Sequence, residues 1–419
     1  MTATLDTSAA PARRARTRRM ALGLGLAVIV LALAIIASLA WGTRSIAPSA
    51  VWDALTSPEA TGDEALIVTT LRVPRTILGV VAGAALGAAG ALMQAITRNP
   101  LAEPGILGVN AGAAAAVAAG IAFAGATNIG VYMWFAFAGA GVAAVVVYAI
   151  GGVFGNNGSV VRLTLAGAAV AVVLSSFTTA LLINYPSVFD VFRYWDVGTI
   201  QGRDLSIVAA VTPAIVVGLG LALALTPRLN VMALGNEMGR ALGANPRTTV
   251  IVAAIAVMLL AGGATAAAGP LAFVGLAAPH LARAVVGADH RWLLPYSILL
   301  GAVLLLGADV IGRVIAAPAE LQSGIMTAII GGPVFIAIAR RRRLAKHERP
   351  HACRRPPHPH GPTVRAVESP RRRRGAGPPA CHRCGRGARA VHRHHHRPAA
   401  RCGGGDLRAG RPARRDGGA

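Results

Sequence analysis

The sequence predicts an all-α integral membrane protein with about ten transmembrane helices. Of its 419 residues, 54% are hydrophobic and only 14% are charged, and the mean hydropathy is +0.57, which is too apolar for a water-soluble globular chain. Residues 20 to 340 divide into apolar runs of about the 20 residues that a helix needs to cross a bilayer. These runs are rich in Gly and Ala, which let membrane helices pack closely.

Ten spans follow one another along the chain with approximate bounds. They lie at residues 20–41, 68–96, 106–124, 130–151, 161–183, 205–225, 248–268, 270–285, 293–315 and 323–340. The eighth is short and is interrupted by Pro279. Small-residue stretches at 79–92 and 259–273 each run into a proline-containing turn, one in each half of five spans. An odd number of spans per half makes the two halves an inverted repeat.

Positive charges predict the orientation in the membrane. The basic N-terminal segment, residues 1–19, carries RRARTRR before the first span, and cytoplasmic loops collect Lys and Arg. The N-terminus is therefore expected inside, and ten spans place the C-terminus inside as well. With this assignment, inside segments up to residue 346 hold 17 Lys and Arg, whereas outside segments hold six. The first span is expected to be an uncleaved anchor rather than a signal peptide.

The transmembrane region, 20–343, is followed by a basic low-complexity tail, 344–419. From residue 347 onward the chain has 18 Arg against 4 acidic residues, all four Cys and nine of the eleven His, but no Ile, Phe, Tyr, Trp or Met. Such a segment cannot build a core. It fits out-of-frame translation of GC-rich DNA, and the alternatives are a metal-binding tail built on the CHRC motif or a disordered basic segment on the cytoplasmic membrane surface. Because more than half of the net charge of +24 lies in this tail, we expect no nucleic-acid partner.

A polar stretch, TRNPLAEPGILG at 97–108, joins the second and third spans. Pro100 and Pro104 end one helix and start another, and non-helical backbone at membrane depth is tolerated only where it is buried in protein or lines a cavity. Gln94, Arg98, Asn99 and Glu103 can satisfy the backbone groups that the break leaves free. The turn is either a stiff helical hairpin or part of a translocation path.

Several separated motifs resemble one known family. The stretch LRVPRTILGVVAGAALGAAGALMQAITRNPLAEPGILGVNAGA is similar to the signature of the FecCD-type permeases, the membrane subunits of bacterial ABC importers for iron(III)-siderophores, haem and cobalamin. GPLAFVGLAAPHLAR, GADHRWLLPYSILLGAVLLLGADVIGR and SGIMTAIIGGPVFIAIARRRR follow in the family's order. The resemblance covers about residues 20–343 and implies the vitamin B12-importer-type permease fold. Gln322 stands where the family usually has proline, and the tail has no counterpart.

The longest inside loop, 229–248, contains a short helix with its own start and stop signals. Asn236 is a plausible N-cap, Glu237 suits the first turn, Gly243 can take the left-handed position after the helix, and Pro246 blocks its continuation. The resemblance implies that this helix couples the permease to its ATPase, and the alternative is an ordinary surface helix. The predicted coupling residues are Gly235, Asn236, Glu237, Gly239, Arg240, Ala241, Leu242 and Gly243.

Three arginines are expected at the outer ends of spans. Arg72 and Arg75 lie at the mouth of the second span, and Arg313 ends the ninth, near Glu320. Exposed arginines suit bidentate pairing with carboxylates, and the resemblance implies that they receive acidic residues of a periplasmic or lipid-anchored substrate-binding protein. The alternative is ordinary anchoring of helix ends. Asp309 lies four residues before Arg313, so the two are expected to pair on one helix side.

Two further segments and the two histidines within residues 1–346 also carry predictions. The Gly/Asn turn at 152–160 resembles the family's inner gate by position only, so the predicted pathway or gate residues are Gln94, Asn99, Pro100, Pro104, Asn156 and Asn157. The segment 189–204 is expected to be amphipathic at the outer interface or to line the substrate entrance. His280 is expected to be a hydrogen-bonded residue at a helix break, and His290 to be solvated or to face the ATPase.

The resemblance implies a transport subunit of the inner or plasma membrane, without catalytic residues, metal or cofactor of its own. The chain lacks a GxxxxGK[ST] loop, so ATP is expected on separate ABC ATPase subunits. A second permease subunit, identical or related, is also implied. An ion-coupled transporter is disfavoured because Asp309 is the only carboxylate well inside a span, and an intramembrane enzyme because the spans lack HExxH and Cys. Ferric siderophore, the family's commonest cargo, is the expected substrate, with cobalamin and haem as alternatives.

Overall fold

The computed structural model describes residues 9–57, 62–152, 160–243 and 245–347, and all its regular elements in these ranges are helical. Ten helices correspond to the ten predicted spans. They are α1 (Ala9–Ala40), α4 (Val73–Thr97), α5 (Val109–Ala124), α6 (Ile129–Ile150), α7 (Val160–Asn184), α9 (Leu205–Met232), α11 (Pro246–Ala268), α12 (Val274–Val286), α13 (His290–Ile315) and α14 (Ser323–His347).

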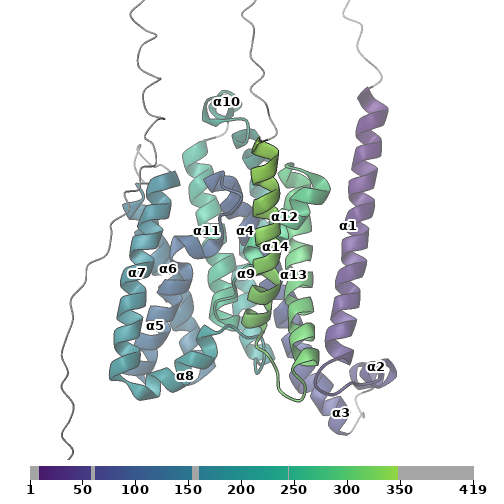
Figure 1. Cartoon of the computed structure of the whole chain (residues 1–419), viewed down its shortest axis with the longest axis vertical. Helices are drawn as coiled ribbons and strands as arrows, with labels where there is room; N and C mark the ends of the chain where they lie inside the picture. The colour runs from purple at the N-terminus through teal and green to yellow at the C-terminus, as the bar shows by residue number, and fades with distance from the viewer. Residues whose placement is uncertain (1–8, 58–61, 153–159, 244, 348–419) are drawn as a thin grey trace, which may run out of the picture. The chain divides into compact units, whose positions relative to one another are not determined.

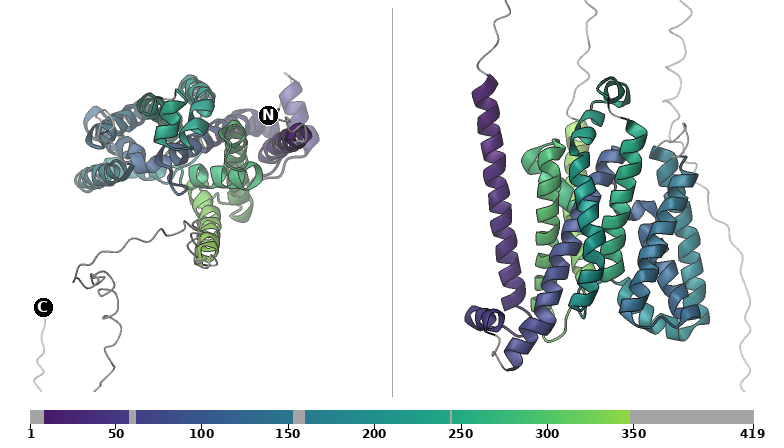
Figure 2. Two further views of the ribbon diagram at one scale, coloured as in Figure 1. Left: turned by 90° about the horizontal axis from the view of Figure 1, so that it is seen from above. Right: turned by 180° about the vertical axis from the view of Figure 1, so that it is seen from behind.

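Short helices occupy the connections between these ten. They are α2 (Pro48–Thr56), α3 (Asp63–Leu66), the π-helical turn η1 (Ile67–Arg72), the 3₁₀ turn η2 (Pro104–Leu107), α8 (Pro186–Asp196) and α10 (Asn236–Ala241). Figure 1 shows α2, α3 and α8 at one end of the bundle and α10 at the other, and the reverse view in Figure 2 agrees. We call these the α2 end and the α10 end.

The helix lengths fit a multi-pass membrane protein. Within the described residues, seven helices are long and apolar enough to cross a bilayer, and α5 and α12 are shorter apolar helices. The stretch Asp63–Thr97 forms one of the seven, because α3, η1 and α4 run on continuously. Large apolar side chains such as Leu33 on α1 (60% exposed) and Val173 on α7 (67% exposed) face outward, as lipid contact requires.

Helix α4 is the central element of the bundle, and small residues explain why. It packs against α9, α11, α12 and α13. A Cβ atom at Gly87 would lie 2.0 Å from the carbonyl oxygen of Ser297 on α13, and one at Gly83 would lie 2.6 Å from that of Gly301. Only glycine permits this backbone approach, which places α13 directly along α4.

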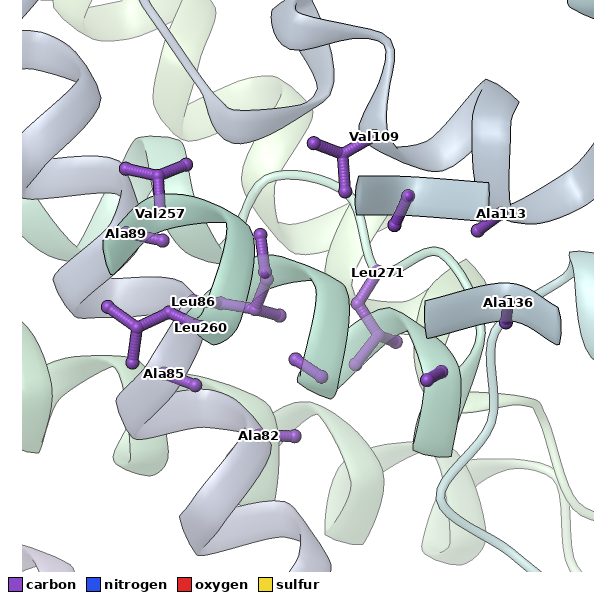
Figure 3. Packing of buried hydrophobic residues seen from close by; sticks show 14 of the residues in the cluster. Ala82, Ala85, Leu86, Ala89, Val109, Ala113, Ala136, Val257, Leu260 and Leu271 are labelled. Atoms are coloured by element: carbon purple, nitrogen blue, oxygen red, sulfur yellow. The ribbon is translucent and has the colours of Figure 1, made fainter. Parts of the chain in front are cut away.

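The main hydrophobic core continues from α4 into the helices on its other side. Figure 3 shows alanines of α4 gathered with Val257 and Leu260 of α11 and with Val109 of α5. Leu260 and Val257 are fully buried. The core is therefore built mainly from Ala, Gly, Val and Leu, and dense packing between close backbones replaces large side chains.

Several predicted span boundaries differ from the structure: α1 begins at Ala9 rather than at 20, and α14 ends at His347 rather than at 340. Helix α9 continues through Pro227 to Met232, seven residues beyond the predicted end at 225. Helix α12 begins at Val274 rather than at 270, because Gly269 (φ +76°) and Phe273 (φ +67°) take left-handed conformations that end α11 and delay the next helix. The segment 270–273 is thus non-helical backbone, in which Leu271 is buried and Ala272 is exposed.

Candidate functional site

At the α2 end, two arginines and two carboxylates from α4, α13 and the α13–α14 loop form one cluster. Arg75 donates to both carboxylate oxygens of Asp309, with Nε–Oδ2 at 3.0 Å and Nη2–Oδ1 at 2.8 Å. Arg313 Nη2 lies 3.1 Å from Asp309 Oδ2, so the predicted pair one helix turn apart is confirmed. Arg75 Nη1 also donates to Glu320 Oε2 at 2.7 Å. We call Arg75, Asp309, Arg313 and Glu320 the arginine–carboxylate cluster.

The expectation that Arg72, Arg75 and Arg313 are exposed is wrong. In the structure these three residues are only 6%, 7% and 2% exposed. Arg72 donates to the carbonyl oxygens of Leu39 and Arg44. A buried guanidinium is tolerated only when it is paired or hydrogen-bonded, and here backbone carbonyls and carboxylates supply the partners. The predicted role of the three arginines in docking stays a prediction.

Two serine side chains form hydrogen bonds with the buried members of the cluster. Asp309 is fully buried and accepts a hydrogen bond from Ser323 Oγ at 2.9 Å. Arg313 donates to the carbonyl oxygen of Ser38 at 3.1 Å and to its Oγ at 3.1 Å. Helices α1, α4, α13 and α14 are therefore joined at this depth by one hydrogen-bonded network.

Glu320 forms the open edge of the cluster. Its side chain is 21% exposed, whereas that of Asp309 is 0% exposed. It borders a cavity of about 330 Å³, which we call the α2-end cavity. Five arginines but only two carboxylates line this cavity, so it is electropositive. The charged lining residues are Arg44, Arg72, Arg75, Arg203, Arg313, Asp204 and Glu320.

Arg203 was not predicted as a site residue. It lies in the loop between α8 and α9, and its Nε is buried without a hydrogen-bond partner among the described residues. Burial lowers the pKa of its guanidinium, although nearby Tyr132 opposes that shift. In the sequence it is one Arg in a polar loop, with no spacing that links it to Arg72 or Arg75, which are about 130 residues away.

At the α10 end, the predicted short helix is present with a different start. Its first helical residue is Asn236, and Gly235 (φ +112°) occupies the N-cap position predicted for Asn236. Glycine fits because this backbone conformation is strained for residues with a Cβ. Gly243 (φ +81°) takes the predicted left-handed position, and Pro246 begins α11.

Helix α10 exposes both charged and apolar side chains. Glu237, Arg240 and Ala241 are exposed, and Gly239 is buried against the end of α9. Leu234, Met238 and Leu242 are 66%, 54% and 58% exposed. Three large apolar side chains on one small loop form a surface suited to a protein partner.

Of the four side chains predicted to satisfy backbone groups freed in the turn between α4 and α5, Asn99 does so within the turn, whereas Arg98 and Gln94 donate to carbonyl groups of α9 and α12. Arg98 (φ +49°) ends α4 and donates from Nη2 to the carbonyl oxygen of Met232 at 3.2 Å. Asn99 Oδ1 accepts from the backbone N–H of Leu101 at 3.0 Å, and Gln94 Nε2 donates to the carbonyl oxygen of Leu276 at 3.4 Å. Burial raises the pKa of Glu103 in this turn.

Of the other predicted gate residues, the described ranges include Pro100 and Pro104 but not Asn156 and Asn157. Pro100 is half-buried in the turn, and Pro104 begins η2, where it packs against Gly275 of α12. Asn156 and Asn157 lie outside the described residues, as do all four Cys and the CHRC motif. The gate role of this group stays a prediction.

The two histidines of the bundle are both buried. His280 Nδ1 lies 3.3 Å from the carbonyl oxygen of Leu276, which agrees with the predicted hydrogen-bonded residue near Pro279. His290 is only 8% exposed, so the expectation of a solvated side chain is wrong. It is held at the first turn of α13 by Asn230 of α9, whose Oδ1 lies 2.8 Å from His290 Nδ1.

Comparison with known proteins identifies the family. The FecCD transport family matches residues 30–341. The ferric enterobactin transport system permease protein FepD of Escherichia coli is 44% identical over 305 residues, which are 73% of this chain and 91% of that protein. The siderophore transport system permease protein YfiZ of Bacillus subtilis is 42% identical over 73% of this chain and 92% of that protein. The cobalamin import system permease protein BtuC of Halobacterium salinarum is 40% identical over 67% of this chain and 74% of its own length.

A solved structure agrees with the fold. A metal-chelate type ABC transporter in an inward-facing conformation superposes with a TM-score of 0.66 at 25% identity, covering 76% of this chain and 98% of that chain. The helical bundle, its membrane-spanning lengths and the match over residues 30–341 lead to one conclusion. This chain belongs to the FecCD transport family and is a multi-pass membrane permease of the kind found in ABC importers for iron-siderophores and cobalamin.

Proposed function

We propose that this chain is the permease subunit of a binding-protein-dependent ABC importer that carries a ferric siderophore into the cytoplasm. ATP hydrolysis on a separate ATPase subunit drives the transport. The observation that carries the proposal is the 44% identity to the ferric enterobactin permease over 91% of that protein. Cobalamin remains the second candidate because a cobalamin permease is 40% identical, and haem is the third.

The charge arrangement supports an importer over an ion-coupled transporter. Asp309 is the carboxylate that lies deepest within a predicted span, and Arg75 and Arg313 both pair with it. A carboxylate paired with two arginines is a poor site for a transported proton or sodium ion, because the arginine donors already occupy both of its oxygens. Asp309 therefore serves the structure of the bundle.

We propose that the α10 end faces the cytoplasm and docks on the ATPase. The excess of Lys and Arg in the segments at this end supports the orientation. Leu234, Met238 and Leu242 supply exposed apolar contact, and Glu237 and Arg240 flank it with charge. This composition, an apolar centre with a charged rim, is that of a protein interface.

We propose that the α2-end cavity receives carboxylates of a substrate-binding protein. Five arginines line it against two carboxylates, and even with Asp309 and Glu64 paired to three of these arginines one positive charge is left for an incoming acidic side chain. The arginines are already held in place by backbone carbonyls and by Asp309, which reduces the entropy that docking costs.

We propose that the outer face of α7 contacts a second permease subunit, identical or related. Only 22% of its spanning window is buried within this chain. Its exposed hydroxyl groups at Ser176 and Thr179 have carbonyl partners within their own helix, at Val172 and Ser175. Small and hydroxyl residues favour close helix contact or a hydrated path over lipid contact.

Uptake in a deletion strain tests the proposed function. The strain carries either the full chain or a version stopped after Lys346, and receives radiolabelled ferric enterobactin, cobalamin or haem in separate assays. Restored iron uptake by both versions supports the siderophore permease and makes the tail dispensable. Uptake of only another cargo contradicts the siderophore, and no uptake with the partner subunits present contradicts the importer.

A further inference from the structure

Asn230 at the end of α9 holds together two segments that meet at the α10 end. Its Nδ2 donates to Asp289 Oδ1 at 2.7 Å, and its Oδ1 accepts from the backbone N–H of His290 at 2.8 Å. The imidazole Nδ1 of His290 lies 2.8 Å from the same oxygen. One amide thus binds both the residue that caps α13 and the first residue of that helix.

The chemistry at this junction requires the asparagine amide in one orientation. A backbone N–H can only donate, so Oδ1 must face His290, and Asp289 as a carboxylate can only accept, so Nδ2 must face it. Asp289 Oδ1 also caps α13 by accepting from the backbone N–H of Arg291 at 3.0 Å. Burial raises the pKa of Asp289, but the hydrogen bonds from Arg291 and Asn230 outweigh it and leave this pKa below its usual range. Asp289 is therefore ionised at neutral pH.

The junction lies at the base of the coupling segment. Asn230 precedes α10 by six residues, and the carbonyl oxygen of Met232 between them accepts from Arg98 of the α4–α5 turn. The end of α9 is therefore hydrogen-bonded both to the start of α13 and to the α4–α5 turn, just before the chain enters α10. A displacement of α10 can reach the bundle through these contacts on one side and through α11, which follows α10, on the other.

Helix α13 leads from this junction to the other end of the molecule. Its 26 residues span about 39 Å at 1.5 Å per residue. It begins at His290, which Asn230 holds, and carries Asp309 and Arg313 of the arginine–carboxylate cluster near its other end. Pro295 lies in the second turn of α13, and the helix packs closely along α4, so we expect the part beyond Pro295 to move as one body.

We propose that Asn230 is a positioning residue that makes α13 move with the coupling segment, so that the α10 end and the α2-end cavity act together. This inference rests on the proposed function, because it requires an ATPase at the α10 end and a binding protein at the α2 end. It predicts that the Asn230 junction is needed for communication between the two partners and not for assembly of the bundle.

A charge exchange across the junction tests the proposal. The full chain is reconstituted in proteoliposomes with its ATPase and binding protein, as wild type, N230D, D289N and the double variant N230D/D289N. N230D removes the donor and places a second carboxylate beside Asp289. D289N keeps both the cap and the acceptor for Asn230, so it is the matched control. In the double variant, the amide of residue 289 donates to the carboxylate of residue 230, so the hydrogen bond is restored in reverse.

The readout is the stimulation of ATP hydrolysis by the binding protein, measured beside basal hydrolysis and thermal melting. We expect stimulation to fall at least fivefold in N230D, with basal hydrolysis and melting temperature close to wild type, and to return in the double variant, while D289N resembles wild type. Stimulation that is unchanged in N230D overturns the proposal. So does a loss explained by a lower melting temperature, since that indicates only a structural role. Absence of stimulation in the wild type contradicts the proposed function itself.

Discussion

At the scale of single residues, Asp309 balances two buried arginines. Arg75 and Arg313 both direct donors at its carboxylate, and all three residues are less than 10% exposed. Such a group contributes little net stability when intact, since burying its charges costs about as much as their attraction returns. Removing one member is different, because the remaining charges stay buried without compensation.

We therefore expect D309N to destabilise the protein by about 3–5 kcal/mol, the range for a broken buried ion pair. Thermal melting in detergent and the yield of folded protein measure the effect. The control is D190N, since Asp190 lies on the surface, 3.7 Å from Arg193, with side chains 69% and 50% exposed. An exposed pair of this kind contributes about 1 kcal/mol at most. Equal melting of D309N and D190N would contradict a structural role for Asp309.

Glu320 has a different role from Asp309 because it is partly exposed. It occupies Arg75 Nη1 at the edge of the α2-end cavity, where an incoming carboxylate of a binding protein would have to displace it. We expect E320Q to raise the affinity for the binding protein severalfold, because the substitution removes this competing charge while Asp309 still holds Arg75.

Binding of the purified substrate-binding protein to the permease in nanodiscs measures this effect at low and high salt. The control is E64Q, which removes another carboxylate at the α2 end, one paired to Arg44 at 3.6 Å with a side chain 45% exposed. We expect E64Q to change the affinity less than E320Q. A weaker complex in E320Q would mean that Glu320 itself contacts the partner.

At the scale of helices, the glycines of α4 determine which helix lies beside it. Gly87 and Gly83 leave space for the backbone of α13, whereas a methyl group at Gly307 of α13 meets nothing within 4 Å. We expect G87A to destabilise the protein by about 1–3 kcal/mol through overpacking. G307A should be neutral or slightly stabilising, since alanine favours helix by about 0.5–1 kcal/mol.

Each variant adds one methyl group to a glycine within a helix, so the difference between their melting temperatures reports packing. A melting temperature for G87A at or above that of G307A would contradict the close approach of α4 and α13. The same pair also tests transport, since α13 carries His290, which contacts Asn230, and Asp309 and Arg313 of the arginine–carboxylate cluster. A displaced α13 is expected to impair coupling even where the bundle still folds.

The accuracy of the sequence predictions depends on how far apart the interacting residues are. Local signals succeeded: the apolar runs predicted the spanning helices, and Gly243 and the Asp309–Arg313 pair depend on residues within one turn. The prediction that Arg75 is exposed was wrong because its partner Asp309 is 234 residues away in the chain. The prediction that His290 is solvated was wrong because Asn230, which holds it, is 60 residues away. Tertiary contacts of this kind leave no pattern in a single sequence.

At the scale of the whole molecule, the proposed function divides between two ends joined by helices. The described ranges, 9–57, 62–152, 160–243 and 245–347, include the whole of the family match at 30–341 except residues 58–61, 153–159 and 244. The α2 end holds an electropositive cavity, and the α10 end holds a small exposed loop with apolar side chains. Two different surfaces at opposite ends suit a protein that receives cargo on one side of a membrane and energy on the other.

The orientation of these ends can be measured because residues 1–346 contain no cysteine. In a chain stopped after Lys346, single substitutions place a thiol at the α2 end, as Asp63→Cys, or at the α10 end, as Arg240→Cys, both at exposed positions. A membrane-impermeant maleimide is expected to label Asp63→Cys in right-side-out vesicles and Arg240→Cys in inverted vesicles, because segments rich in Lys and Arg stay in the cytoplasm. The chain without either substitution is the control for background. The reverse labelling pattern would place the arginine cavity in the cytoplasm, where no binding protein could reach it, and would contradict both proposed docking surfaces together.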